Sequence, residues 1–139
     1  MTTPQSERAP KLLIVDDSPV DLHFARQCVA AEGCEIIFAA NGREALEIIA
    51  QNRPDVVLTG LQMPEINGLE LILRIKELAP DIPVMLMTAH GSEEVVLQVL
   101  KAGAASYIPK RHLQRDLPQA LRNVLSALEA QRRRALREP

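Results

Sequence analysis

Residues 55–64 read Asp55-Val56-Val57-Leu58-Thr59-Gly60-Leu61-Gln62-Met63-Pro64, a mostly apolar run that ends in a glycine and a Met-Pro turn. The run over 55–59 does not alternate between apolar and polar residues, which is typical of a strand covered on both faces. Four similar short runs lie outward along the chain, over 12–15, 35–39, 84–88 and 106–108. Together these runs predict five buried strands.

The longer segments between the runs carry the signals of helices. Ser18 followed by Pro19 is typical of a helix start, with the serine as the cap and the proline at the first helical position. We expect this helix to end at Gly33 in a left-handed turn. Further starts are expected at Asn41, Asn67, Ser92 and near His112, and further ends at Asn52-Arg53-Pro54, Pro80, Gly103 and beyond Leu128.

Strands and helices therefore follow one another in a βα order that repeats five times, which predicts an α/β fold. Right-handed crossovers turn this (βα)5 order into a doubly wound, five-stranded parallel sheet with helices on both faces. Ligands bind such sheets at the carboxyl ends of the strands. We expect the polar and catalytic-type positions at those ends to meet on one rim, namely Asp16, Asp17, Gly60, Thr88 and Lys110.

Length and composition limit the function classes. The 139 residues, 47% of them hydrophobic and 24% charged, suit one ordinary globular domain, which we expect over 11–128. A formal net charge of -2 and 2% aromatic residues argue against direct nucleic-acid binding. No apolar run approaches the ~20 residues that span a bilayer. Cys28 and Cys34 match no metal-site spacing, and we expect them to be reduced thiols.

The two ends of the chain read differently from its middle. Residues 1–10 are polar and lack an apolar export segment, so we expect a flexible leader and a cytoplasmic protein. Residues 129–139 contain four arginines. They predict either a solvated helix end, where cations suit the helix dipole, or a linker to a missing output region.

The motifs at the strand ends resemble the receiver domain of bacterial two-component response regulators. The resemblance covers roughly residues 11–128 and implies the flavodoxin-like strand order 2-1-3-4-5. Each motif alone is weak, but their order and their places on the predicted elements make the set specific. They are Asp16-Asp17, Met63-Pro64 followed by Asn67-Gly68, Thr88-Ala89, and Tyr107 with Lys110.

The resemblance implies a role for each of these residues. In the family, an aspartate three residues before the Met-Pro methionine accepts a phosphoryl group, and that position is Gly60 here. Asp16, Asp17 and the backbone carbonyl of Gln62 would hold Mg²⁺. Lys110 would pair with a phosphate oxygen, while Thr88 and Tyr107 would form the switch that responds to it. Arg111 is a smaller departure, because many relatives have proline there.

Glycine at this position has chemical consequences. It has no side chain on which an acyl phosphate can form, and it removes one anionic oxygen, so we expect Mg²⁺ to bind more weakly. Lys110 loses a partner, and we expect it to lean on Asp17. The absence of a carboxylate at position 60 is either natural, as in a pseudo-receiver, or the result of a recent or engineered substitution. The joint presence of the supporting residues favours the second origin.

We therefore expect a signalling domain, and not an enzyme, that acts through protein contacts with a histidine kinase or phosphotransfer protein. An alternative is a natural pseudo-receiver that serves as a constitutive interaction or dimerisation module. The expected helix between Ser92 and Gly103, the strand over 106–108 and the last helix would supply a homodimer face. A flavodoxin-like cofactor binder is less well supported, because Asp16-Asp17 puts negative charge where a flavin phosphate would lie.

Overall fold

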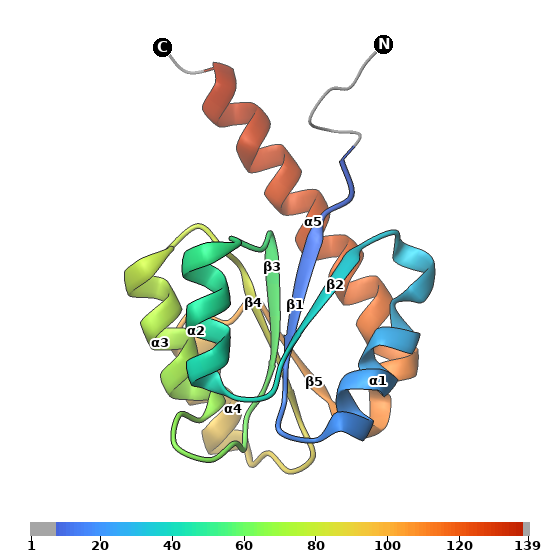
Figure 1. Ribbon diagram of the computed structural model, residues 1–139, viewed down its shortest axis with the longest axis vertical. Helices are drawn as coiled ribbons and strands as arrows, with labels where there is room; N and C mark the ends of the chain where they lie inside the picture. The colour runs from blue at the N-terminus through green and yellow to red at the C-terminus, as the bar shows by residue number, and fades with distance from the viewer. Residues whose placement is uncertain (1–7, 138–139) are drawn as a thin grey trace.

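The computed structural model describes residues 8–137, so most of the expected leader over 1–10 lies outside the described residues. Within this range five strands alternate with five α-helices (Figure 1). The strands are β1 (Lys11–Val15), β2 (Glu35–Ala39), β3 (Val56–Gly60), β4 (Val84–Thr88) and β5 (Ser106–Pro109). The helices are α1 (Pro19–Cys28), α2 (Gly42–Gln51), α3 (Gly68–Leu78), α4 (Glu93–Lys101) and α5 (Leu113–Arg137), with short 3-10 turns η2 (Ala30–Glu32) and η3 (Lys110–His112).

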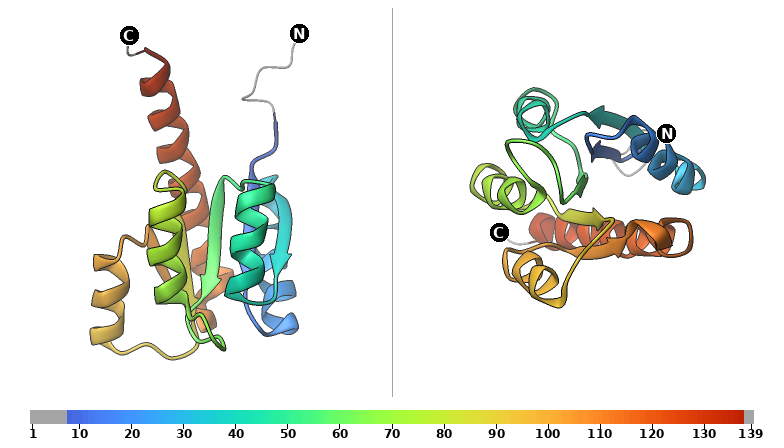
Figure 2. Two further views of the ribbon diagram at one scale, coloured as in Figure 1. Left: turned by 60° about the vertical axis from the view of Figure 1, so that its left-hand side comes forward. Right: turned by 90° about the horizontal axis from the view of Figure 1, so that it is seen from below.

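The sheet confirms the predicted topology. All four strand pairs are parallel, and the order is β2-β1-β3-β4-β5. Helices cover both faces, with α1 and α5 on one side and α2, α3 and α4 on the other (Figure 2). Each face has its own hydrophobic core. Leu22, Leu117 and Leu121 belong to the first, while Ile49 and Leu71 belong to the second.

Side-chain caps fix the starts of four helices, as the sequence predicts. Each cap oxygen accepts a hydrogen bond from a backbone N–H in the first helical turn, which satisfies one of the donors that the helix start leaves free. Because these helices follow strands β1 to β4, the caps also set where each chain segment leaves the rim. The capping residues are Ser18, Asn41, Asn67 and Ser92.

The expected end of the first helix is wrong. Helix α1 ends at Cys28, because the N–H of Val29 bonds to the carbonyl of Arg26 and the chain tightens out of α geometry. The turn η2 follows, and Gly33, at φ 77°, ends that turn in the left-handed region. The thiols of Cys28 and Cys34 are free and half-buried, and burial raises the pKa of both.

Helix α5 is longer than the core needs. Its buried side chains stop at Leu128, and its last turns project beyond the amino ends of the strands, away from the opposite rim (Figure 1). Arg132 ties this extension back to the domain, because its guanidinium lies 2.8 Å from Asp55 Oδ1 at the start of β3. Among residues 8–137, none of the helices combines the length and the apolar composition that a membrane span requires.

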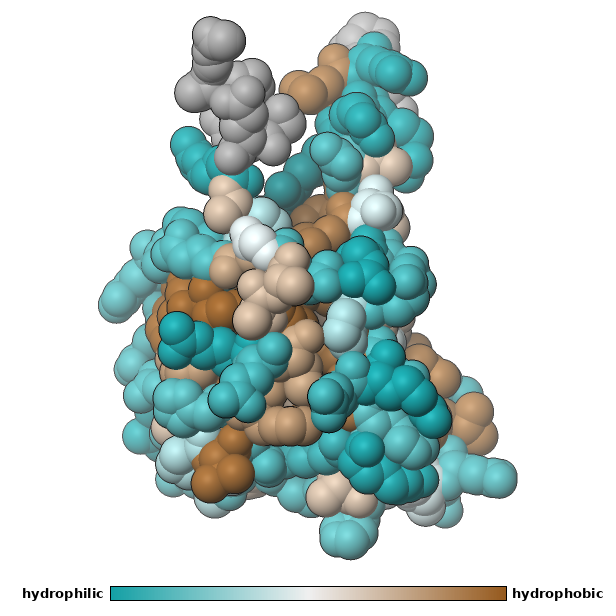
Figure 3. Space-filling view, turned by 90° about the vertical axis from the view of Figure 1, so that its right-hand side faces the viewer, coloured by the Kyte–Doolittle hydropathy of each residue, from teal (hydrophilic) through white to brown (hydrophobic). Residues whose placement is uncertain are grey.

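The face that carries α1 and the edge strand β2 is largely hydrophilic (Figure 3). On this face, apolar residues are visible mainly in the middle, between polar ones (Figure 3). Val20 and Phe24 of α1 are among the exposed large apolar side chains.

Candidate functional site

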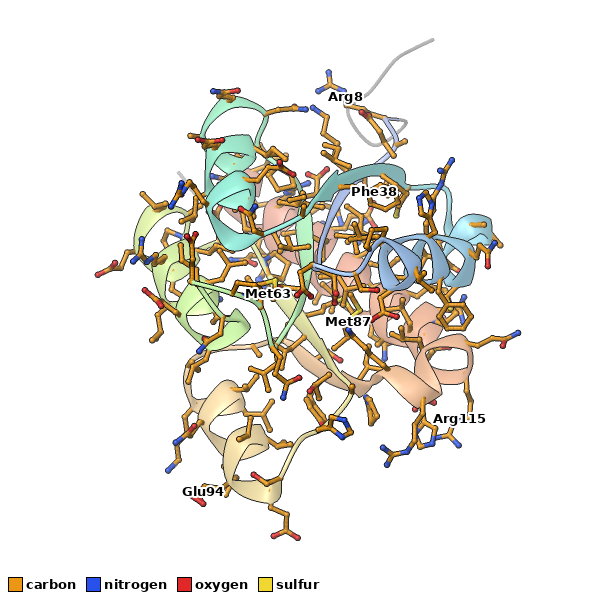
Figure 4. All side chains as sticks on the ribbon, turned by 60° about the horizontal axis from the view of Figure 1, so that its bottom comes forward. Arg8, Phe38, Met63, Met87, Glu94 and Arg115 are labelled. Atoms are coloured by element: carbon orange, nitrogen blue, oxygen red, sulfur yellow. The ribbon has the colours of Figure 1, made fainter. Side chains whose placement is uncertain are left out.

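The carboxyl ends of β1, β3, β4 and β5 bring the expected residues to one rim, which Figure 4 shows from that side. Asp16 follows β1, and its backbone N–H extends the sheet by donating to the carbonyl of Ala39 at 3.1 Å. Its side chain turns inward and is only 1% exposed. The backbone N–H of Ser18 donates to Asp16 Oδ1 at 2.9 Å, which fixes the carboxylate. Asp17, by contrast, is exposed.

Gly60 is the last residue of β3, one position later than the predicted strand end, and it pairs with Met87 of β4. It is buried. A Cβ atom built on Gly60 would collide with Asp16 Oδ2. The space where a side chain would begin is therefore already taken by the Asp16 carboxylate.

The ammonium of Lys110 lies between two carboxylates. Its Nζ is 2.8 Å from Asp16 Oδ2 and donates a hydrogen bond to Asp21 Oδ2 at 2.7 Å. Burial by itself would lower the pKa of Lys110, but the two carboxylates beside its ammonium, those of Asp16 and Asp21, outweigh the burial and raise the pKa. The expectation that Lys110 leans on Asp17 is wrong, because the ammonium pairs with the buried Asp16 and with Asp21, whereas Asp17 is exposed.

Asp16 Oδ2 is electrostatically paired but poorly hydrogen-bonded. The oxygen is buried and has no hydrogen-bond partner, although Lys110 Nζ is within ion-pair distance. The contact is short enough for a hydrogen bond but not at a hydrogen-bonding angle, so Lys110 stabilises Asp16 mainly by its charge. A buried carboxylate oxygen without a donor is costly and has free capacity for a cation.

Sequence reasoning did not assign Asp21 to the site. Asp21 is the third residue of α1, where an acid ordinarily stabilises the helix start through the dipole. The available signal was its place one turn after the acidic pair, which directs its side chain toward the same rim. Nothing local in the sequence indicates Lys110 as its partner, 89 positions away.

Thr88 closes the loop that follows β4. Its Oγ1 donates to the carbonyl of His90 at 2.8 Å and accepts from the N–H of His90 at 3.2 Å. Gln62 Nε2 donates to the same carbonyl at 3.1 Å, so the loops after β3 and β4 are joined. The hydroxyl of Thr88 is therefore engaged by the backbone of its own loop. The imidazole of His90 makes none of these contacts.

Tyr107 lies on β5, the edge strand beside β4. It pairs with Leu86 in the β4–β5 register and is half-buried. Its hydroxyl is so close to Gly91 that a Cβ there would collide with it, and the same Cβ would lie 3.2 Å from Thr88 Cγ2. Both residues expected to form a switch thus contact one short loop, and Gly91 is what allows that close approach.

The donors at this rim suit a hard cation only in part. The carboxylates of Asp16 and Asp17 are the oxygen ligands that Mg²⁺ prefers, and Mg²⁺ keeps several waters when few carboxylates are present. Asp16 Oδ2 is buried and 2.8 Å from Lys110 Nζ, so it would bind a cation only if the ammonium gave way. Over residues 8–137, however, no cluster of three or more His, Cys, Asp or Glu side chains is arranged to hold a metal ion.

An open groove of about 590 Å³ begins beside the acidic pair. It runs from Asp17 past Gln62 and Met63 of the β3–α3 loop to Val95 and Gln98 of α4. Gln62 therefore lies on the same side of the rim as the exposed Asp17. The groove gives a ligand or partner access to the site from the α4 side.

Comparison with protein families gives one match that covers most of the chain. The model of the response regulator receiver domain matches residues 12–122. Response regulator MprA of Mycolicibacterium vanbaalenii is 34% identical over 124 residues, which are 89% of this chain and 51% of that protein. The chain thus spans about half the length of the curated relatives that it matches.

Solved structures of receiver domains and response regulators are also similar to this chain. A CheY-like response regulator receiver domain protein from Methanospirillum hungatei is similar with a TM-score of 0.83 and 30% identity, over 89% of this chain and 99% of that one. A response regulator from Thermotoga maritima is similar with a TM-score of 0.78 and 27% identity, over 86% of this chain and 99% of that one.

Proposed function

The chain belongs to the response regulator receiver domain family, and we propose that it is a receiver whose site cannot accept a phosphoryl group at position 60 and which signals through protein contacts. One observation carries the proposal. Gly60 offers no nucleophile, and the Asp16 carboxylate lies where its side chain would begin. Receiver domains are signalling domains of two-component systems, and this one retains the family's supporting residues around an altered centre.

The retained residues have distinct roles in the proposal. Phosphoryl transfer requires a nucleophile in line with the leaving group and neutralisation of the phosphoryl charge. Asp16, Asp17 and the backbone carbonyl of Gln62 are the groups that would hold Mg²⁺, which supplies that neutralisation when bound. Its affinity is reduced here by the missing carboxylate and by the Lys110 ammonium on Asp16. Lys110 is the point charge for a phosphoryl oxygen.

Thr88 and Tyr107 form the switch in this proposal. Thr88 Oγ1 is bound to the His90 backbone, and Tyr107 is packed against the same loop at Gly91. A phosphoryl group would draw the Thr88 hydroxyl from His90 and free space for the tyrosine. Without a nucleophile at position 60, no phosphoryl group competes with His90 and Gln62 for that hydroxyl, so the loop stays in its present arrangement.

Partner contacts are proposed at two places. A histidine kinase or phosphotransfer protein is the expected partner at the rim. The face of α4, β5 and α5 is the expected surface for a homodimer or an output partner, since Leu97 and Leu100 of α4 are 56% and 47% exposed. Exposed leucines that are close on one helix suit such a contact. Sedimentation of the chain and of Gly60→Asp distinguishes a constitutive dimer from a switched one.

A constitutive interaction module is the second candidate function. The ion pairs of Lys110 with Asp16 and Asp21 favour it, because they neutralise the ammonium without phosphate. In that case the chain presents one fixed surface to its partners. A cofactor enzyme receives no comparable support from the described residues.

The direct test restores the missing carboxylate. Gly60→Asp and the unaltered chain are each treated with beryllofluoride, a phosphoryl mimic, and Mg²⁺, and NMR shifts of Thr88 and Tyr107 are recorded. We expect both residues to shift in Gly60→Asp and neither to shift in the unaltered chain. Equal responses in the two proteins would refute the proposal, as would the lack of a response in both.

A further inference from the structure

The position of Asp21 suggests a role that the family resemblance does not assign. The Lys110 ammonium has three donors and a side chain that is 21% exposed, so it needs anionic partners inside the site. One partner, Asp16, is buried and contacts the ammonium outside hydrogen-bond geometry. The other, Asp21, accepts the ammonium's hydrogen bond at 2.7 Å.

The local structure holds Asp21 in place for this contact. The Ser18 side chain accepts a hydrogen bond from the backbone N–H of Asp21 at 3.2 Å, which fixes the first turn of α1. Pro19 at the first helical position restricts that turn further. The carboxylate of Asp21 is 36% exposed, so its desolvation cost is small, and it reaches the half-buried ammonium from the solvent side.

The charge at position 60 explains why this contact matters. In a receiver with an aspartate there, the lysine has a carboxylate or phosphoryl partner at the centre of the rim. Here Gly60 supplies no charge, and the Asp16 carboxylate occupies the adjoining space. Asp16 alone faces the ammonium through one oxygen that receives no hydrogen bond.

We propose that Asp21 replaces the carboxylate missing at position 60 as the hydrogen-bonding partner of Lys110, and thereby holds the β5–α5 junction against α1. This inference rests on the proposed function, because it assumes that position 60 is the vacated partner site. Asp21 is a positioning residue: it acts through Lys110 and contacts no phosphoryl group. The contact joins α1 to η3, two elements that the sheet alone does not connect.

The proposal predicts energetic coupling between positions 21 and 60. Asp21→Asn keeps the shape of the side chain and removes its charge. In the unaltered chain we expect it to lower the folding equilibrium constant about threefold, as for a partly exposed ion pair. In Gly60→Asp the effect should be smaller, because the new carboxylate can take over Lys110. Urea unfolding of the four proteins gives the double-mutant cycle.

Glu94→Gln is the matched control. Glu94 is also an acid in the first turn of a helix, α4, but it makes no ion pair among residues 8–137. Its replacement should have the same effect in both backgrounds. An Asp21→Asn effect that is equal in the two backgrounds would overturn the inference, since it would reduce Asp21 to a helix-start acid.

A second measurement needs no variant of Asp21. NMR of the unaltered chain should show scalar coupling across the hydrogen bond from Lys110 Nζ to the Asp21 carboxylate, and the coupling should weaken in Gly60→Asp. Absence of coupling in the unaltered chain overturns the inference. Beryllofluoride binding by Gly60→Asp is measured in parallel: its failure refutes the proposed function, whereas the Lys110 coupling reports on Asp21 alone.

Discussion

At the scale of single residues, Gly60 and the Asp16 carboxylate pack directly against each other. Glycine within a strand usually costs about 0.5–1 kcal/mol relative to alanine, so Gly60→Ala would normally stabilise the fold. Here the added Cβ meets Asp16 Oδ2, and the carboxylate is held by Ser18 and Lys110. We expect Gly60→Ala to lower the free energy of unfolding by about 1–3 kcal/mol in urea, as overpacking does. A stabilised variant would show that Asp16 is free to move.

Glu65 is the one non-glycine residue with positive φ in the described range, at 67°. Its side chain pairs with Arg43 at 3.3 Å, but both side chains are about two-thirds exposed, so the pair contributes little. We expect Glu65→Asn to raise the free energy of unfolding by roughly 0.5–1 kcal/mol, because asparagine tolerates this conformation better. Arg43→Gln is the control: it removes the same ion pair without relieving the backbone, and its effect should be near zero or slightly unfavourable.

Lys110 should make the free energy of unfolding depend on pH in the alkaline range. Its pKa is raised in the folded protein, so its contribution is fully present below the ordinary lysine pKa of about 10.4. The contribution is lost as the pH rises through the raised value. The difference in unfolding free energy between the chain and Lys110→Gln should therefore shrink above that pH. Lys101→Gln, at an exposed position without an ion pair in residues 8–137, should show no such change. A constant difference for Lys110→Gln would contradict the assignment.

At the scale of elements, α5 combines a core helix with an extension. Stopping the chain after Glu129 keeps every buried side chain of α5 and removes the Arg132–Asp55 pair. We expect a loss of less than about 1 kcal/mol in urea unfolding. Stopping after Arg122 also removes Val124 and Leu128, which are buried, and should cost several kcal/mol. Similar losses from the two truncations would mean that the extension belongs to the folding core.

Elements were predictable where their signals are local. Apolar runs located the strands to within one residue, and four helix starts followed from Ser or Asn caps at the expected positions. The end of α1 was not predictable, because Val29 leaves the helix to pack against the rest of the fold. Gly33, which lies further along the chain, is the stronger sequence signal for a helix end. The strand order came from the family resemblance and the crossover rule, not from any single element.

At the scale of the whole molecule, topology explains how the site forms. Four parallel strands end at one rim, so acids after β1, the glycine of β3, the threonine of β4 and the lysine after β5 become neighbours. That convergence could be predicted from the sequence. The partner of Lys110 could not, because it depends on which of Asp16 and Asp17 turns inward and on where α1 places Asp21.

The most direct test of the altered receiver site is intact-mass spectrometry after incubation with a small-molecule phosphodonor and Mg²⁺. The unaltered chain should gain no phosphoryl group, because Gly60 has no oxygen to accept it and Asp16 is buried against Lys110. Gly60→Asp should gain one, because Lys110, Thr88 and the acidic pair remain. Modification of the unaltered chain, or no modification of Gly60→Asp in its folded state, would contradict the account.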